Sequence, residues 1–345
     1  MRLDGARLEP MKSEGDAVSQ EVFGRLIMAD RWRLLIAIVG VLCLAAQPGL
    51  SLPPKALDSV VSVLPVWPGY DKKSAGNAKP GEEPEGTAVA IKPGGYLVTS
   101  FHVIDRAVSV TVRLADGLVL PAEIVGRDRA TDLALLKVAQ DLTVPPLGPE
   151  PALAAPVCVV GNQFGLGLSV TCGVVSAVHR TGVGFNPIED FIQTDAAANP
   201  GSSGGALFDG EGRLVGVVSA IFTKDADANI GVNFAASIPL VMRVVEDLIA
   251  HGRVVRGRPG LRVADLEEAD RQRMVGAVIV RIAPGGSAEA AGLKPGDVIT
   301  RIGDRAIRRA SDVTSAVHMY RVGERFDVAV LREGRPRTLS VQLMR

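Results

Sequence analysis

The pattern that most restricts the fold of this chain is a long succession of short apolar runs between residues 86 and 235, separated by turns that contain Gly or Asp. Examples are GYLVTSFHVI at 95–104 and ALFDGEGRLVGVVSAI at 206–221. Runs of this length with Gly-containing turns are typical of β-strands and hairpins. The 38 glycines agree with a turn-rich β protein. We therefore expect a mainly β domain, closed by the helix-periodic stretch Ile238 to His251.

Inside this region, the stretch ANPGSSGGALFD at 198–209 places Ser203 between Gly201 and Gly204. Clusters of Gly and Ser are often only turns, but glycine also lets backbone N–H groups approach a reacting oxygen beside a hydroxyl. The stretch also fits G-x-S-x-G, the nucleophile elbow of α/β-hydrolases, which requires a helix after the serine. Because a hairpin pattern follows Ser203, an acid and a base should lie upstream, in the order His, Asp, Ser.

The four histidines narrow the choice of base. His102 directly follows a strand-like run, whereas His179, His251 and His318 fit structural or solvent-facing positions. For the acid, Asp132 opens the apolar run ATDLALLKV at 130–138. A carboxylate at the start of such a strand is costly unless a partner, such as a histidine N–H, holds it. The sequence therefore pairs His102 with Asp132.

Four motifs in order, GYLVTSFHVI, RATDLALLKV, GNQFGLG and FIQTDAAANPGSSGGAL, resemble the HtrA/Deg family of serine proteases. The resemblance runs from about Ser62 to the C-terminus and implies a mainly β chain, with a chymotrypsin-like double β-barrel followed by a small α/β PDZ domain. It implies Ser203 as nucleophile, His102 as general base and then acid, and Asp132 as the group that orients the imidazole. The N–H groups of Gly201 and Ser203 would form the oxyanion hole.

The chain divides into five expected parts: a polar region at 1–33, a signal peptide or membrane anchor at 34–52, a protease domain at 56–251, a basic linker at 252–259 and a PDZ domain at 260–345. Within the protease part, Ala56–Leu64 fits a first strand, and the polar stretch 70–85 fits a loop. Within the last part, GGSAEAAGLKPGD at 285–297 resembles a PDZ segment, and Glu333-Gly334 fits a hairpin turn.

The apolar run LLIAIVGVLCLAA at 34–46 follows Arg31 and Arg33. Its length is that of a signal-peptide core and is short for a membrane span, so a cleaved signal and a retained anchor both stay open. The residues before it are acidic, whereas MADRWR from Met28 has the form of an ordinary basic leader. We therefore expect translation to begin at Met28, and the protein to be periplasmic or otherwise extracytoplasmic, either soluble or anchored to the inner membrane.

Substrate preference is expected from four positions. Ala197 lies six residues before Ser203, where trypsin-like enzymes carry an acid that binds Arg or Lys. Ser219, Ala220 and Ile221 lie on the strand that would face the substrate. The sequence thus predicts cleavage after small or medium aliphatic side chains. In the same region, Ser202 and Ala206 stand where the family usually has Asn and Pro, which affects the rigidity of the loop more than its chemistry.

The composition excludes some partners and leaves others open. The formal net charge is zero, which gives no support to a nucleic-acid partner, and no metal-ligand spacing or cofactor motif is present. By resemblance, the partners are unfolded proteins or peptides, PDZ ligands and further copies of the chain. The copies would form a homotrimer, with Trp67 and Tyr70 as contacts, and a larger assembly stays open. Cys158 and Cys172 fall on runs that could be neighbouring strands, where buried free thiols are more common than a disulfide.

Two hypotheses concern the PDZ domain. Its carboxylate-binding loop aligns with Pro259, Gly260 and Leu261, and Pro259 has no N–H to donate. We therefore expect weak recognition of free C-termini, unless Pro259 only stiffens the linker. The second hypothesis belongs to another functional class: a PDZ-bearing scaffold or chaperone with little protease activity. The main expectation remains an ATP-independent serine endopeptidase of the cell envelope that cleaves unfolded or damaged proteins or a regulatory target.

Overall fold

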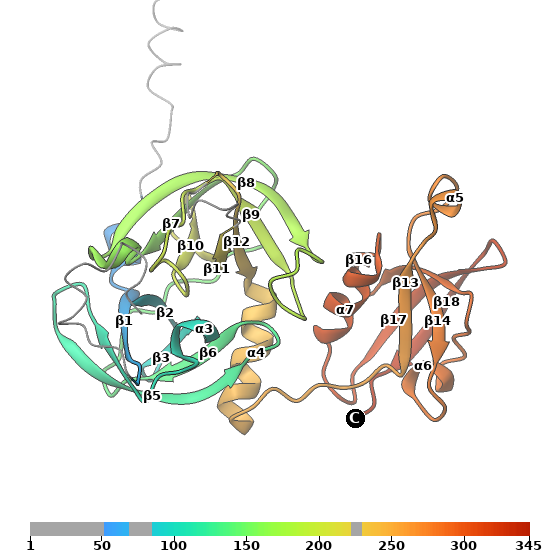
Figure 1. Ribbon diagram of the computed structural model, residues 1–345, viewed down its shortest axis with the longest axis horizontal. Coiled ribbons are helices and arrows are strands. Elements are labelled where there is room, and N and C mark those ends of the chain that lie inside the picture. The colour runs from blue at the N-terminus through green and yellow to red at the C-terminus, as the bar shows by residue number, and fades with distance from the viewer. Residues whose placement is uncertain (1–51, 69–84, 222–229) are drawn as a thin grey trace, which may run out of the picture. The chain divides into compact units, whose positions relative to one another are not determined.

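The computed structural model describes residues 52–68, 85–221 and 230–345 (Figure 1), without the side chains of Ala220 and Ile221. The expectations about Met28, about the apolar run at 34–46, about the loop after Tyr70 and about Tyr70 itself fall outside these residues. Within the described residues, every helix is too short or too polar to cross a bilayer.

The first half of the protease region forms a closed barrel of six antiparallel strands in the order β1-β2-β3-β6-β5-β4. Its interior holds aliphatic side chains such as Val61, Val112 and Leu136, which suit the pleated surface of a strand. The strands are β1 (Val60–Val66), β2 (Gly86–Lys92), β3 (Tyr96–Ser100), β4 (Ser109–Arg113), β5 (Val119–Asp128) and β6 (Leu133–Lys137).

A second closed barrel follows in the order β10-β11-β12-β9-β8-β7. Its β10–β11 hairpin is the one expected after Ser203, and its interior includes Val157, Val175 and Leu207. Figure 1 shows the two barrels beside each other. The expected double barrel is therefore confirmed. The strands are β7 (Pro156–Gly161), β8 (Ser169–Arg180), β9 (Phe191–Thr194), β10 (Ala206–Asp209), β11 (Leu214–Ile221) and β12 (Asn233–Ser237), with a short 3-10 helix η2 (Gln163–Gly165).

Helix α4 (Ile238–His251) has the expected bounds. The Ser237 side chain accepts the N–H of Leu240 at its start, and Gly252 ends it in the left-handed conformation. Its apolar face shares one core with side chains of both barrels, among them Leu135 and Phe208. The helix thus fastens the two barrels together.

The C-terminal part is a small sheet in the order β13-β14-β15-β17-β18, with β16 paired to β15. Strand β13 lies at one edge. Glu333 and Gly334 both have positive φ and turn β17 into β18, as expected for this hairpin. The elements are β13 (Leu261–Asp265), α5 (Glu268–Arg271), β14 (Ala277–Ile282), α6 (Ser287–Ala290), β15 (Val298–Ile302), β16 (Arg305–Ala306), α7 (Ala310–His318), β17 (Arg325–Arg332) and β18 (Arg335–Gln342).

Two local expectations were wrong. The segment expected to open the first strand begins instead with a one-turn helix α2 (Pro54–Leu57), because proline suits the first helical turn, and β1 begins only at Val60. The sequence also favoured free thiols, but Cys158 and Cys172 form a disulfide. They lie directly opposite each other on β7 and β8, where side chains are close, and Cys172 is exposed rather than buried.

Candidate active site

The contact between His102 and Asp132 is the centre of the site. His102 lies in the one-turn helix α3 (Phe101–Ile104), directly after β3, and Asp132 lies directly before β6. The Nδ1 of His102 is 2.7 Å from Oδ2 of Asp132, and the backbone N–H of His102 donates to Oδ1 at 2.9 Å. With Nδ1–H donated to the carboxylate, Nε2 of the neutral ring carries the free lone pair that a general base needs.

Asp132 is buried and has an unusual backbone conformation, although its side chain is charged. It is 7% exposed and has φ of 56°, a conformation that non-glycine residues adopt mainly where the surroundings enforce it. The hydroxyl of Ser219 donates to Oδ2 at 3.3 Å. Ser219, which the sequence assigned to substrate binding, therefore contacts the acid directly.

Backbone hydrogen bonds of Ser203 and of the next residue fix the position of the serine. Its carbonyl accepts the N–H of Thr87 at 2.9 Å, and the N–H of Gly204 donates to the carbonyl of Val218 at 2.7 Å. Gly204 has φ of 83°, and a Cβ there would overlap the carbonyl oxygen of Thr87. Among the described residues, the Ser203 hydroxyl makes no hydrogen bond. In enzymes without bound substrate, hydrogen bonds between a nucleophile and its base are often long and tighten only once substrate binds.

The turn before the serine also requires glycine. Gly201 has φ of 92°, and a Cβ would overlap the carbonyl oxygen of Asn162. Its own carbonyl accepts the hydroxyl of Thr87 at 2.7 Å. Within the described part of the chain, the N–H groups of Gly201 and Ser203 donate to no acceptor. Two backbone donors are therefore available beside the serine.

The β7–β8 hairpin supports this turn from one side. The N–H of Phe164 donates to the carbonyl of Pro200 at 2.7 Å, and the side chain of Asn199 donates to Gln163 at 2.6 Å. The hydroxyl of Thr171, on β8, donates to the carbonyl of Ala197. The Cys158–Cys172 disulfide links the two strands of this hairpin, so it lies within the scaffold that carries the turn.

Ser202, one of the departures from the family pattern, fastens the same turn from within. Its hydroxyl donates to the carbonyl of Asn199 at 2.6 Å, and its N–H donates to the same oxygen at 2.9 Å. Ala206, the other departure, is buried at the start of β10.

The loop between β8 and β9 forms a wall beside His102. Phe185, Asn186 and Pro187 line an open cavity of about 550 Å³ together with His102 and Asp132. The buried carboxylate of Glu189 holds this loop, because it accepts four successive backbone N–H groups, from residues 183 to 186, at 2.7–3.0 Å. Sequence reasoning missed Glu189, since an acid in an irregular segment carries no pattern.

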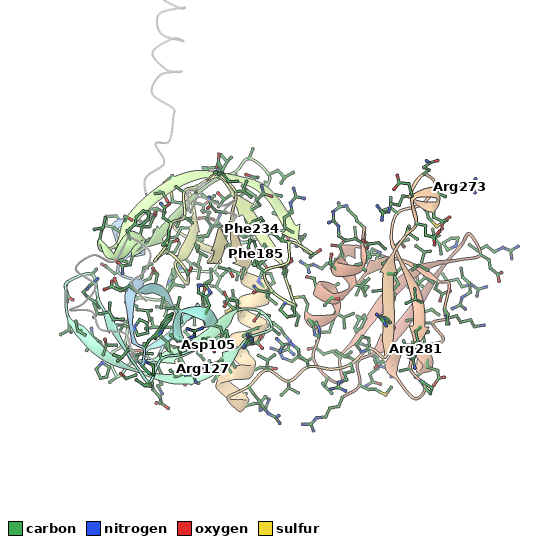
Figure 2. The ribbon with its side chains drawn as sticks, in the orientation of Figure 1. Asp105, Arg127, Phe185, Phe234, Arg273 and Arg281 are labelled. Atoms are coloured by element: carbon green, nitrogen blue, oxygen red, sulfur yellow. A yellow bond between two sulfur atoms is a disulfide. The ribbon has the colours of Figure 1, made fainter. Side chains whose placement is uncertain are left out.

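An aromatic cluster supports this wall from behind. The ring of Phe185 lies 5.6 Å from that of Phe234 on β12, and Phe191 on β9 completes the group. Figure 2 shows Phe185 and Phe234 next to each other. Of the predicted substrate-binding residues, Ala197 is half-buried beside the turn, and the side chains of Ala220 and Ile221 lie outside the described part.

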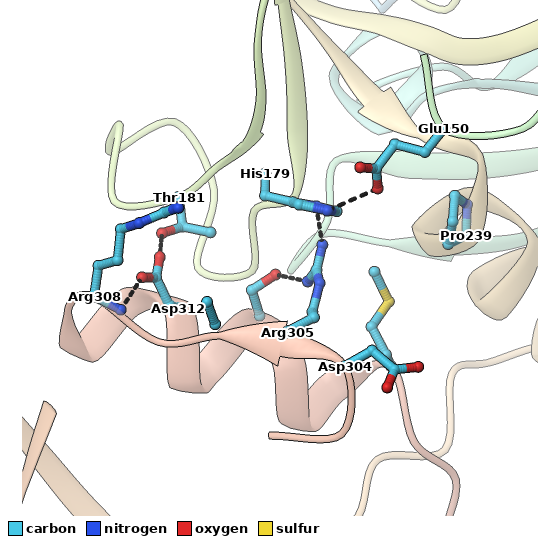
Figure 3. A pocket seen from close by; sticks show the side chains of 11 residues that line it. Glu150, His179, Thr181, Pro239, Asp304, Arg305, Arg308 and Asp312 are labelled. Carbon is cyan, nitrogen blue, oxygen red and sulfur yellow. Dashed lines mark hydrogen bonds and ion pairs between the residues drawn. The ribbon is translucent and has the colours of Figure 1, made fainter. Parts of the chain in front are cut away.

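Both ends of the same loop contact residues of the PDZ part, beside a charged pocket that His179, Thr181 and Arg305 line (Figure 3). The carboxylate of Asp190 is fully buried and contacts His179 at 3.0 Å, and also Arg305. Burial alone raises the pKa of Asp190, but the hydrogen bond from His179 and the charge of Arg305 outweigh it, so its pKa lies below the usual value. Thr181 donates to Asp312 at 2.5 Å.

Among the described residues, none of the three remaining histidines has a hydrogen bond or ion pair with His102, Asp132 or Ser203. His179 belongs to the charged pocket, where Nε2 also contacts Glu150 at 2.7 Å, and His251 is exposed at the end of α4. His318 is half-buried on α7. Burial and the nearby charges of Arg256 and Arg243 lower its pKa to about 4.

The predicted PDZ loop packs against α6. The carbonyl of Pro259 accepts the N–H of Ala288 at 2.8 Å, and the carbonyl of Gly260 accepts that of Ala283 at 2.7 Å. Gly260 has φ of 69°, and Leu261 begins β13 opposite Ile282. The linker before this loop contacts the first barrel, since the guanidinium of Arg256 donates a hydrogen bond to Asp128 on β5.

A double β-barrel with a histidine–carboxylate pair and a glycine-flanked serine, followed by a separate small sheet, defines a trypsin-like serine peptidase with a further domain. The family model of the trypsin-like peptidase domain matches residues 86–217, and that of the PDZ domain matches residues 257–343.

Named relatives agree with this class. The periplasmic serine endoprotease DegP of Salmonella typhimurium is 37% identical over 260 residues, which cover 72% of this chain and 54% of that protein. A probable DegP-like periplasmic serine endoprotease of a Marinomonas species is 38% identical over 266 residues, or 75% of this chain and 56% of that protein. The chain thus spans about half the length of these curated relatives.

A solved structure of the HtrA-type protease AlgW with a tripeptide is 34% identical, with a TM-score of 0.66, and the match covers 85% of this chain and 97% of that one. The crystal structure of a serine endoprotease from Yersinia pestis is 29% identical, with a TM-score of 0.57, over 85% of this chain and 99% of that one. The chain belongs to the HtrA family of serine proteases, and one PDZ domain follows the peptidase domain in the matched residues.

Proposed function

We propose that this protein is an ATP-independent serine endopeptidase whose catalytic residues are Ser203, His102 and Asp132. The observation that carries the proposal is the 2.7 Å contact between His102 and the nearly buried Asp132, beside a glycine-flanked serine. Asp132 orients the imidazole and stabilises its protonated form. His102 takes the Ser203 proton through Nε2 and later returns it to the leaving amine.

The proposed oxyanion hole consists of the N–H groups of Gly201 and Ser203. Support comes from their lack of an internal acceptor among the described residues and from the positive φ of Gly201. Donors fixed in this way stabilise the negative oxygen of the tetrahedral intermediate without having to reorganise.

The proposed substrates are unfolded or damaged proteins or a regulatory target, cut after small or medium aliphatic residues. Ala197 supports this preference because it offers no carboxylate to a basic side chain. Ser219, another residue of the predicted pocket, donates its hydroxyl to Asp132. The side chains expected to complete the pocket are those of Ala220 and Ile221. A peptide panel that is cut fastest after Lys or Arg would contradict this preference.

The proposed organisation keeps a protease domain at 56–251, a linker at 252–259 and a PDZ domain at 260–345 that captures peptides or regulates the protease. The PDZ loop would consist of Pro259, Gly260 and Leu261. The proposed location is periplasmic or otherwise extracytoplasmic, since the relatives named above are periplasmic endoproteases. A homotrimer, with Trp67 and Tyr70 at its contacts, and a signal or membrane anchor at 34–52 remain part of the proposal.

Casein turnover by wild-type protein and by Ser203→Ala tests the proposal. Loss of the nucleophile should lower kcat by roughly 10⁶-fold, as in other triads. Equal rates for the two proteins would instead favour the scaffold or chaperone, whose activity does not need the serine.

A further inference from the structure

The PDZ sheet has a free edge at β13, the first strand in the order β13-β14-β15-β17-β18. PDZ domains bind peptides as an extra strand on such an edge, so that side chains of alternate peptide residues face opposite sides of the sheet. The inference below rests on the proposed peptide capture by this domain and concerns which peptides it selects.

Two arginines face each other beside this edge. Arg262 on β13 is the direct antiparallel partner of Arg281 on β14, and both side chains are exposed. Figure 2 labels Arg281 on its strand. Neither side chain has a hydrogen bond or ion pair with any residue in the described part of the chain.

The register fixes the face on which the pair lies. Leu261 and Ile282, the preceding pair, pack against the core, as does Val263 after it. Arg262 therefore points to the opposite, outer face. A strand added beside β13 would place every second side chain on this outer face, next to Arg262, while the others face α7.

An unneutralised pair of this kind is unfavourable, because like charges directly opposite each other in a sheet destabilise it. A third exposed arginine, Arg258, precedes the same end of β13. Residues 252–345 as a whole contain 18 Lys and Arg against 11 Asp and Glu, although the complete chain is neutral. A negatively charged ligand would therefore neutralise the positive charge at this edge of the sheet.

We propose that Arg262 and Arg281 select peptides with an acidic side chain at the penultimate position of a free C-terminus, or two residues before it. The terminal apolar side chain lies on the core face of the sheet, as Leu261 does, and the penultimate one faces outward against the arginine pair. The ligand carboxylate neutralises both guanidinium groups. In this arrangement, acidic side chains offset the donor that Pro259 does not supply.

Fluorescence polarisation of labelled C-terminal hexapeptides against the full chain carrying Ser203→Ala, which prevents cleavage, tests the proposal. Three peptides differ only at the penultimate residue, which is Glu, Gln or Lys. The Glu peptide should bind roughly three- to tenfold more tightly than the Lys peptide, with the Gln peptide between them. The difference should shrink in high salt, because the pair is exposed.

A charge reversal provides the matched comparison. Arg262→Glu should reverse the order, so that the Lys peptide binds best. Arg273→Glu makes the same change of charge on an exposed arginine just beyond α5 (Figure 2), and it should leave the order unchanged. Thermal unfolding confirms that each variant is folded.

Equal affinity for the three peptides, or a preference that Arg273→Glu alters as much as Arg262→Glu, would overturn the proposal while leaving peptide capture intact. Failure of all three peptides to bind would overturn both the proposal and peptide capture, without affecting casein cleavage. Loss of binding to anionic phospholipid vesicles in Arg262→Glu, with no peptide preference, would assign the pair to a membrane surface instead.

Discussion

The carboxylate of Glu189 accepts the backbone N–H of Phe185 at 2.7 Å, and the same carboxylate holds three neighbouring N–H groups. Phe185 lines the cavity beside His102. A single buried side chain within the β8–β9 loop thus fixes the part of that loop that forms one wall next to the proposed base. The position of this wall therefore depends on Glu189.

Replacing Glu189 by Ala should loosen this wall. Four N–H groups lose a charged acceptor, and hydrogen bonds to charged groups contribute about 1.5–3 kcal/mol each when lost singly. We expect a raised KM and a tenfold or greater loss of kcat/KM for a peptide substrate, with the protein still folded. Glu211→Ala, at an exposed turn, should change neither quantity. A Glu189→Ala enzyme with wild-type kinetics would show that the loop holds its shape unaided.

The disulfide should stabilise the scaffold of the serine turn. Cys158 and Cys172 enclose a short loop, and removing a native disulfide typically costs about 2–4 kcal/mol. The double variant Cys158→Ser, Cys172→Ser should unfold at lower temperature and cleave casein more slowly below that temperature. A reducing dithiol should reproduce both effects in wild-type protein and have no effect on the double variant. A dithiol effect that persists in the double variant would assign it to another part of the chain.

The Asp190–Arg305 pair should couple measurably. Asp190 is fully buried and its pKa is held low by His179 and Arg305 despite burial, so removing Arg305 leaves a buried charge short of a partner. A double-mutant cycle with Asp190→Asn and Arg305→Ala should give a coupling free energy of about 1–3 kcal/mol in thermal or urea unfolding. The exposed pair Glu268–Arg271 should show no measurable coupling. Equal coupling in both pairs would contradict the importance of burial.

Stability should fall in mild acid through His318. Its pKa is lowered to about 4 by burial and by Arg256 and Arg243, against the weaker opposing effect of Asp128. The unfolded chain therefore binds this proton first as the pH falls from about 6.5 towards 4, and the folded state loses up to about 3 kcal/mol over that window. His318→Gln should show a smaller difference in Tm between pH 7 and pH 5 than wild type. An unchanged difference would mean that other groups dominate the acid sensitivity.

The sequence predicted the parts of the fold that follow from periodicity and turn chemistry. The mainly β domain, the bounds of α4 and the Glu333-Gly334 hairpin all follow from local patterns, whereas the double barrel was implied by the resemblance to the HtrA/Deg family. The contact between His102 and Asp132 was also predictable, because an acid at the start of an apolar strand needs a partner and only one histidine was suitably placed.

The remaining features depend on register, which a single sequence does not reveal. Cys158 and Cys172 pair because β7 and β8 place them directly opposite each other. Arg262 meets Arg281 only because of the alignment of β13 with β14, next to a bulge. Glu189 accepts backbone N–H groups from residues 183 to 186 only because their loop folds back towards its carboxylate. Ser219 and Asp132 are 87 residues apart in the chain. None of these contacts has a signature in the local sequence.

The most direct test of the proposed mechanism is to locate the adduct of a serine-directed fluorophosphonate by mass spectrometry of the digested protein. The reagent requires a serine activated by its neighbouring base. The proposed mechanism predicts one adduct, on the peptide that contains Ser203, in wild-type protein, and loss of that adduct in His102→Ala. Undiminished labelling of Ser203 in His102→Ala, or casein cleavage that continues with Ser203 replaced by Ala, would contradict it.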